Sequence, residues 1–148
     1  MHTINRSLIL PYSASEMYGL VDDIDQYYTF LPWCEHSAVL DRRKTQVTAR
    51  IGVSYKGLQT VFTTRNQLTV NQEVIMELVE GPFEHLSGLW FFQSLDVKAC
   101  KVSLDMRFSL SNRLANQTLT PIYKHIASTL VESFAKQAKS VYGERQFS

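Results

Sequence analysis

The sequence has few of the features that mark secreted or membrane-spanning proteins. It contains only two cysteines, Cys34 and Cys100, which form no framework of spacings, so we expect two free thiols in a cytosolic protein. No window approaches the ~18 continuous apolar residues of a transmembrane helix, and the N-terminus shows no secretory signal. The net charge of +1 excludes a global field that would steer the chain to nucleic acid or to an acidic membrane.

Catalytic and metal-binding motifs are also missing. The histidines are scattered without ligand spacing, and there is no HExxH, GxSxG or phosphate loop. Cys34 and His36 lie two residues apart, which would put both on one face of a strand, but nothing in the sequence orients the imidazole. The sequence therefore predicts no catalytic residue, no metal site and no required cofactor.

Aromatic and aliphatic residues, in contrast, are plentiful. Of 148 residues 45% are hydrophobic, including eight Phe, seven Tyr and two Trp, which is enough for one sizeable core in a single domain over 1–148. Residues 3–10 alternate like a strand. Ser13 and Glu16 have the spacing of a capping box that opens a helix, and residues 23–31 look like a second short helix ended by Pro32.

Residues 36–110 follow a period of two, which is typical of strands. The clearest alternation points one set of side chains inward: Val102, Leu104, Met106, Phe108 and Leu110. A second set is Val47, Ala49, Ile51, Val53 and Tyr55. Turn signals at Lys56-Gly57 and at Gly81-Pro82 leave short connections, so we expect antiparallel pairing of about six strands after the first.

The helical period returns near the C-terminus. Thr120 before Pro121 resembles an N-cap followed by proline, which predicts a helix to about Tyr142; residues 112–119 could instead add one or two turns before Pro121. Its apolar stripe is Ile122, Ile126, Leu130, Phe134 and Ala138, widened by Tyr123, Ala127, Val131 and Val141. The fold class is thus α+β, with an antiparallel sheet covered by one long helix and a core or a pocket between them.

Several unusual strings then carry a family resemblance. "LPWC", "YKGL" leading to "FTTRNQL", and "GPFEHLSGLWFF" resemble the START-like family of coenzyme Q-binding proteins and bacterial ribosome-association toxins. The toxin (RatA-like) branch is the closer match over nearly the whole chain. The resemblance implies the START-like helix-grip fold, in which a seven-stranded antiparallel sheet grips the last helix and two short helices follow the first strand.

The same resemblance implies two functions. One is that of a type II toxin-antitoxin toxin that binds the large ribosomal subunit and blocks subunit association, with an antitoxin protein as partner. The alternative is a protein that binds ubiquinone or another isoprenoid lipid in support of respiratory electron transport, at the periphery of the inner membrane. A third hypothesis, a small enzyme acting on a polyketide-like substrate, rests on fold analogy alone.

A lipophilic ligand would occupy the space between sheet and helix. Trp33 could stack on a flat quinone head at the rim, or could simply close the core. Phe83 could form a lid after its turn, or could be tucked inward. The residues expected to line the pocket are Leu31, Trp33, Cys34, Tyr55, Phe62, Met76, Phe83, Trp90, Met106, Phe108, Ile126 and Leu130.

Two polar features complete the candidates. Arg65 and Asn66 lie in mid-strand, either on a surface ladder with Glu77 or Asp105 or as a polar anchor for a ligand head group or an RNA phosphate. The turn of Arg42, Arg43 and Lys44 is either ordinary soluble surface or a contact to ribosomal RNA. Nothing in the sequence indicates DNA as a partner.

Overall fold

The computed structural model describes residues 1–111 and 113–147, and the side chains of 1–111 and 118–147. Seven strands form one antiparallel sheet in the order β1-β7-β6-β5-β4-β3-β2. The strands are β1 (His2–Leu10), β2 (Cys34–Arg42), β3 (Gln46–Tyr55), β4 (Leu58–Thr69), β5 (Glu73–Glu80), β6 (Phe83–Asp96) and β7 (Ala99–Leu110). The helices are α1 (Ala14–Asp22), the 3-10 turn η1 (Ile24–Gln26), α2 (Tyr27–Phe30) and α3 (Arg113–Tyr142). This is the predicted helix-grip architecture.

The first helix begins at the capping box. The Ser13 hydroxyl accepts a hydrogen bond from the Glu16 amide at 3.0 Å, and the Glu16 carboxylate accepts one from the Ser13 amide at 2.9 Å. These bonds satisfy amides that the first helical turn leaves without partners. Helix α1 then buries Met17 and Val21, which confirms the sequence prediction for this segment.

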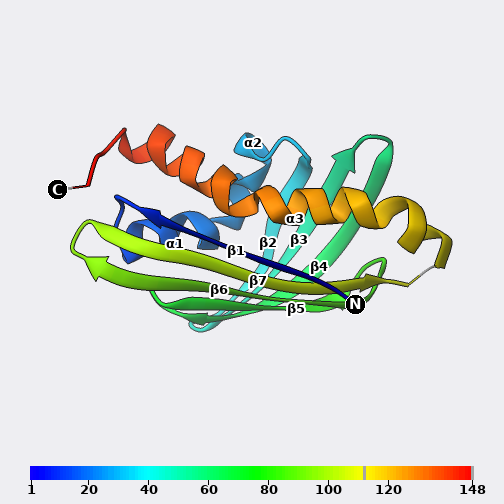
Figure 1. The fold of residues 1–148 in the computed structure, drawn as a ribbon. Coiled ribbons are helices and arrows are strands. Elements are labelled where there is room, and N and C mark those ends of the chain that lie inside the picture. The colour runs from blue at the N-terminus through cyan, green and yellow to red at the C-terminus, as the bar shows by residue number, and fades with distance from the viewer. Residues whose placement is uncertain (112, 148) are drawn as a thin grey trace.

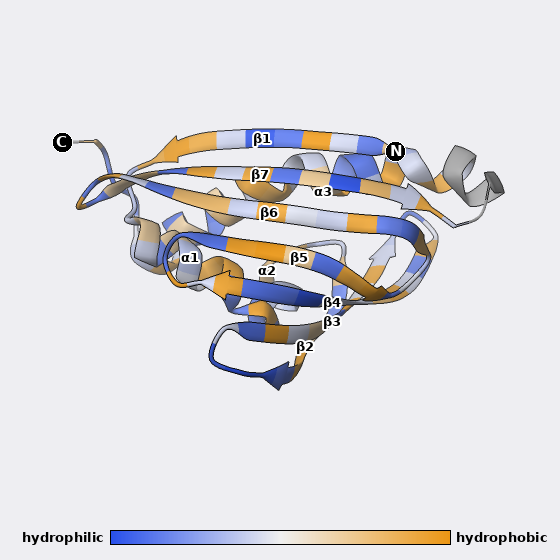
Figure 2. Cartoon of the chain, turned by 90° about the horizontal axis from the view of Figure 1, so that it is seen from below, coloured by the Kyte–Doolittle hydropathy of each residue, from blue (hydrophilic) through white to orange (hydrophobic). Residues whose placement is uncertain are grey.

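Alternation along the strands gives the sheet one solvent-exposed polar face and one buried apolar face. Figure 2 shows hydrophobic and hydrophilic residues alternating along the sheet. In β3 the inward residues from Val47 to Val53 are at most 5% exposed. The β3–β4 hairpin turns at Lys56 and Gly57, whose φ angles of 49° and 83° give the left-handed pair that matches strand twist.

Helix α3 covers the concave side of the sheet (Figure 1). Its predicted stripe is buried from Ile126 to Ala138. The N-cap reading of Thr120 is wrong, because the helix already begins at Arg113 and Thr120 is a buried position inside it. The alternative of extra turns before Pro121 is the correct one. Val141 is also wrong as a stripe residue; it is 53% exposed on the last turn of the helix.

Candidate functional site: an apolar cavity between the sheet and helix α3

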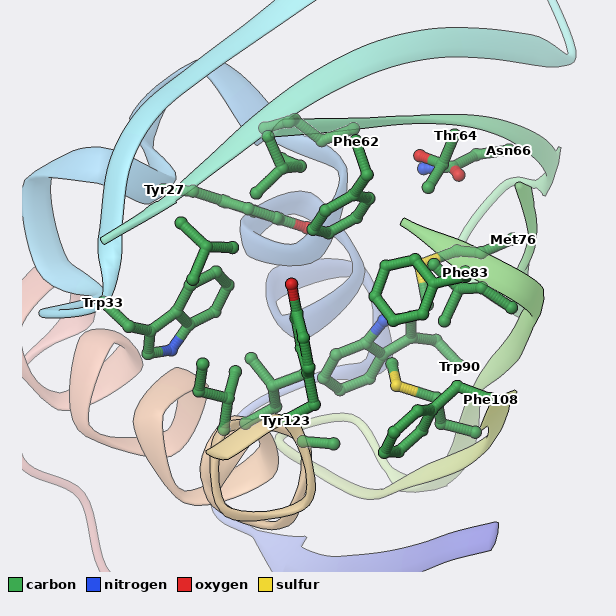
Figure 3. Close-up of a pocket in the computed structure, with 18 of the residues that line it drawn as sticks. Tyr27, Trp33, Phe62, Thr64, Asn66, Met76, Phe83, Trp90, Phe108 and Tyr123 are labelled. Atoms are coloured by element: carbon green, nitrogen blue, oxygen red, sulfur yellow. The ribbon is translucent and has the colours of Figure 1, made fainter. Parts of the chain in front are cut away.

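A cavity lies between the concave face of the sheet and α3 (Figure 3). Its volume is about 100 Å³. Strands β3 to β7 supply most of the wall because their inward residues converge where the sheet curls around the helix. The lining residues are Ile24, Tyr27, Trp33, Ile51, Val53, Phe62, Thr64, Asn66, Met76, Phe83, Leu86, Trp90, Met106, Phe108, Tyr123, Ile126, Ala127, Leu130 and Phe134.

Aromatic rings build the wall through edge-to-face contacts. Phe83 meets the Tyr123 ring at 5.0 Å and the Phe62 ring at 5.6 Å between centroids. Trp90 meets Phe134 at 5.3 Å. Such pairs hold their rings in place and keep the wall stiff. Phe83, only 7% exposed, is thus tucked inward as part of the wall and does not project as a lid.

Three polar atoms within this apolar site have no hydrogen-bond partner among the described residues. They are Asn66 Oδ1, Tyr123 Oη and Trp33 Nε1. Leaving such a group unpaired costs roughly 1–3 kcal/mol. All three residues line the cavity, so a ligand with matching donors and acceptors could satisfy them. Figure 3 shows the Tyr123 hydroxyl pointing into the space between Phe62 and Phe83.

The cavity carries no formal charge. Among the residues that the structure describes, its lining contains no Asp, Glu, His, Lys or Arg. Burial raises the pKa of Tyr123 to about 12, and the nearby Thr60 hydroxyl moderates this rise without reaching hydrogen-bond geometry. Burial also raises the pKa of Tyr27, whose hydroxyl donates to the Val21 carbonyl. Both phenols are therefore neutral at physiological pH, and the site favours an uncharged ligand.

Most of the residues that the sequence picked out for a pocket meet in this cavity. They are Trp33, Phe62, Met76, Phe83, Trp90, Met106, Phe108, Ile126 and Leu130. Eight of the nine lie on inward positions of strands or of α3, and Trp33 precedes β2. Their common placement follows from the two periodicities that selected them.

Leu31, Cys34 and Tyr55 do not line the cavity, which corrects the predicted set. Leu31 ends α2 with its amide bonded to the Tyr27 carbonyl at 2.9 Å, and its side chain is buried elsewhere in the core. The Cys34 thiol is directed to the His36 carbonyl at 3.4 Å. Tyr55 lies at the far end of β3, where its ring stacks on that of His125 at 6.1 Å.

Ten lining residues were not in the predicted set. They are Ile24, Tyr27, Ile51, Val53, Thr64, Asn66, Leu86, Tyr123, Ala127 and Phe134. Ile51 and Val53 belong to the predicted inward face of a strand, and Tyr123, Ala127 and Phe134 belong to the predicted apolar stripe of the C-terminal helix. For Asn66 the sequence left two alternatives open, a surface position or a polar anchor for a ligand. The structure places Asn66 inside, 5% exposed, while Arg65 faces outward beside Glu77 on β5.

Cys34 and His36 also do not share a face. A β-bulge between them shifts the register, so Cys34 pairs with Val53 while His36 pairs with Gly52. Cys34 is buried and His36 is exposed as a result. Burial raises the pKa of the Cys34 thiol, which disfavours the thiolate that a nucleophile would need.

Comparison with known families fits this architecture. Residues 10–135 match the family described as polyketide cyclase / dehydrase and lipid transport. The chain belongs to this family.

Within this family, the curated relatives have names of two kinds. The Escherichia coli ribosome association toxin RatA is 41% identical over 145 residues, covering 98% of this chain and 92% of that protein. The RatA of Vibrio cholerae is 40% identical, covering 97% of this chain and 100% of that protein. A coenzyme Q-binding protein COQ10 homolog from Xenopus laevis is 25% identical, covering 96% of this chain and 60% of that protein.

Solved structures show the same fold at low identity. A Thermus thermophilus protein superposes with a TM-score of 0.82 at 14% identity, covering 94% of this chain and 98% of the other. A Streptomyces aromatase/cyclase superposes with 0.78 at 15% identity, covering 93% of each chain. At these identities the likeness shows the shared fold. Among the described residues, no helix has the length and apolarity needed to cross a membrane.

Proposed function

We propose that this chain is a ribosome-association toxin that binds the large ribosomal subunit and hinders its joining with the small one. The observation that carries this proposal is its 41% identity, over 98% of the chain, to a protein of that name. The match extends across every element of the fold rather than over the cavity alone.

The proposed action is by binding rather than by catalysis. The described part of the cavity lining offers no carboxylate, imidazole or amine as a general acid or base, its two phenols are held neutral by burial, and the buried Cys34 thiol has a raised pKa. Acyl transfer or dehydration would need at least one such group close to the substrate. Steric occupation of a subunit face needs none.

Sucrose-gradient sedimentation tests the proposal. The purified chain is added to separated large and small subunits under conditions that favour joining, and separately to ribosomes already assembled. We expect free subunits to accumulate in the first case and the chain to sediment with the large subunit. Unchanged joining with no chain in the large-subunit fraction would refute the proposal.

A second candidate is the binding of an uncharged, largely apolar ligand. The unpaired polar atoms of Asn66, Tyr123 and Trp33 favour it. The volume of about 100 Å³ limits it, because drug-sized ligands occupy roughly 300–1,000 Å³. A quinone with an isoprenoid tail would therefore need α3 to move away from the sheet. A small ring with one or two polar groups would need a smaller movement of the helix.

Mass spectrometry of an organic extract from the natively purified protein tests this candidate. A quinone or another lipophilic compound near one per chain would support it. A clean extract, together with no binding of added ubiquinone by the purified protein, would exclude the ligand role and leave ribosome association as the function.

A further inference from the structure

The basic turn between β2 and β3 is largely neutralised. Arg42 is paired with Asp22 at 3.0 Å, and Arg43 with Asp41 at 3.1 Å. Only Lys44 of the three cations is without an ion pair in the described part of the chain. Phosphates would have to compete with these carboxylates, so this turn is a poor anion-binding surface.

A groove with cations on both walls lies elsewhere, between β1 and the first half of α3. It has a volume of about 590 Å³ and is lined by Ile4, Arg6, Thr120, Pro121, Lys124, His125 and Ser128. β1 is an edge strand paired only with β7, so the flank of α3 is open on this side. The strand period puts Arg6 on the same face as buried Ile4, directly beside the helix.

The positive charge continues across the helix to its other flank. His125 stacks on the Tyr55 ring with 4° between the planes, and Lys56 Nζ lies 5.4 Å from the centroid of that ring. Figure 1 shows the β3–β4 hairpin and β1 on opposite sides of α3. Arg6, Lys124, His125, Tyr55 and Lys56 thus form one line over the helix, the cationic strip.

The cations of the strip are free of carboxylates. Arg6, Lys56 and Lys124 take part in no ion pair among the residues that the structure describes. Within the described part of the chain, Arg6 donates only to the neighbouring Asn5 carbonyl, at 3.0 Å. An incoming phosphate therefore meets three uncompensated charges from three different elements, with nothing to displace.

We propose that the cationic strip is the surface that binds the RNA phosphate backbone of the large ribosomal subunit. This inference rests on the proposed function and assigns it a face. The strip lies on the opposite face of α3 from the cavity, so RNA binding does not require an occupied cavity. The stacked rings of Tyr55 and His125 add a flat surface against which an unpaired base can stack.

Two triple variants test the assignment, and each removes three positive charges from the chain. The strip variant is Arg6→Gln, Lys56→Gln and Lys124→Gln. The matched control is Arg42→Gln, Arg43→Gln and Lys44→Gln. All six positions are exposed, so both variants should fold, which circular dichroism verifies. Binding of each protein to purified large subunits and to a generic duplex RNA is measured at several salt concentrations.

We expect the strip variant to bind both ligands at least about 10-fold more weakly than the unmodified chain. Each lost phosphate contact reduces the magnitude of the negative slope of log K against log salt by roughly 0.7–0.9, so loss of three contacts should reduce it by about two to three. The control should keep both affinity and slope. Equal losses in the two variants, or none in the strip variant, would overturn the assignment.

The two ligands separate the possible failures. If the unmodified chain binds large subunits and the strip variant binds them equally well, only the strip is refuted. If the unmodified chain binds duplex RNA through the strip but does not bind large subunits, the proposed function fails, and the strip is refuted as a ribosome contact while its affinity for RNA phosphates is confirmed. If the unmodified chain binds neither ligand, both proposals are overturned.

Discussion

At the scale of single residues, Glu16 joins two distant parts of the fold. It closes the capping box with Ser13, and its carboxylate binds the Arg145 guanidinium through two bonds of 2.7 and 2.9 Å. Arg145 also lies over the Tyr12 and Tyr142 rings at 5.0 and 5.9 Å. One carboxylate thus ties the start of α1 to the tail that follows α3.

Glu16→Gln should lower stability in a pH-dependent way. The hydrogen bond from Arg145 is the main cause that holds the pKa of Glu16 below its ordinary 4.5. The stabilisation is therefore complete above about pH 4.5 and is lost as pH falls through the lower folded value. Urea unfolding should show a deficit of up to about 1 kcal/mol near neutral pH that shrinks as the pH falls below the ordinary pKa of 4.5.

The matched control for this change is Glu144→Gln. Glu144 is 77% exposed and pairs with Lys139 only at 3.5 Å, so its loss should leave the free energy of unfolding almost unchanged. A deficit of Glu16→Gln that persisted in full at acid pH would show that the ion pair is not its cause.

Asn66→Leu should make the protein more stable. The change removes a buried amide whose oxygen has no partner and extends apolar surface into the cavity. A gain of about 1 kcal/mol or more in the free energy of unfolding is expected. The control Gln67→Leu alters an exposed neighbour on the same strand. A loss of stability with Asn66→Leu would mean that the amide is satisfied within the protein.

At the scale of elements, α3 serves two surfaces at once. Tyr123, Ala127 and Leu130 line the cavity, whereas Lys124 and His125 belong to the cationic strip. The helical period of 3.6 separates these two sets on opposite faces of the same turns. A single helix therefore builds a ligand site and an outward-facing charged surface without conflict between them.

The two hairpin turns differ in how much they require glycine. A Cβ at Gly81 would lie 2.6 Å from Phe62 Cβ and 3.3 Å from Phe62 Cα, whereas a Cβ at Gly57 would meet nothing. Gly57→Ala should cost about 1 kcal/mol from its positive φ alone. Gly81→Ala should cost above about 2 kcal/mol, measured by urea unfolding, because the clash adds to the strain. Equal costs would contradict this account of the β5–β6 turn.

At the scale of the whole molecule, the cavity and the strip can be disabled separately. Ala127→Leu fills part of the cavity from α3 and should cost no more than the roughly 1–3 kcal/mol of overpacking. It should abolish uptake of a lipophilic ligand, measured by mass spectrometry, and leave sedimentation with large subunits intact. Loss of ribosome association in this variant would show that the two activities depend on each other.

Much of the architecture follows from the sequence because periodicity and capping are local signals. The alternation in residues 101–110 identifies the inward face of β7, and Ser13 with Glu16 marks the start of α1. Most of the nine pocket residues that meet in the cavity could be predicted from the sequence for the same reason. The start of α3 could not be predicted in this way, because Thr120 and Pro121 are typical of a helix N-terminus, whereas the helix in fact begins earlier, at Arg113.

What the tertiary structure alone decided concerns contacts between distant segments. A bulge separated Cys34 from His36, Asp22 neutralised Arg42, and the Tyr55 ring stacked on His125 outside the cavity lining. The cationic strip joins Arg6, Lys56 and Lys124, which no local pattern connects. Sequence determines which face of an element is apolar, because that depends on neighbours in the chain; only packing decides which charges meet a partner, because that depends on neighbours in space.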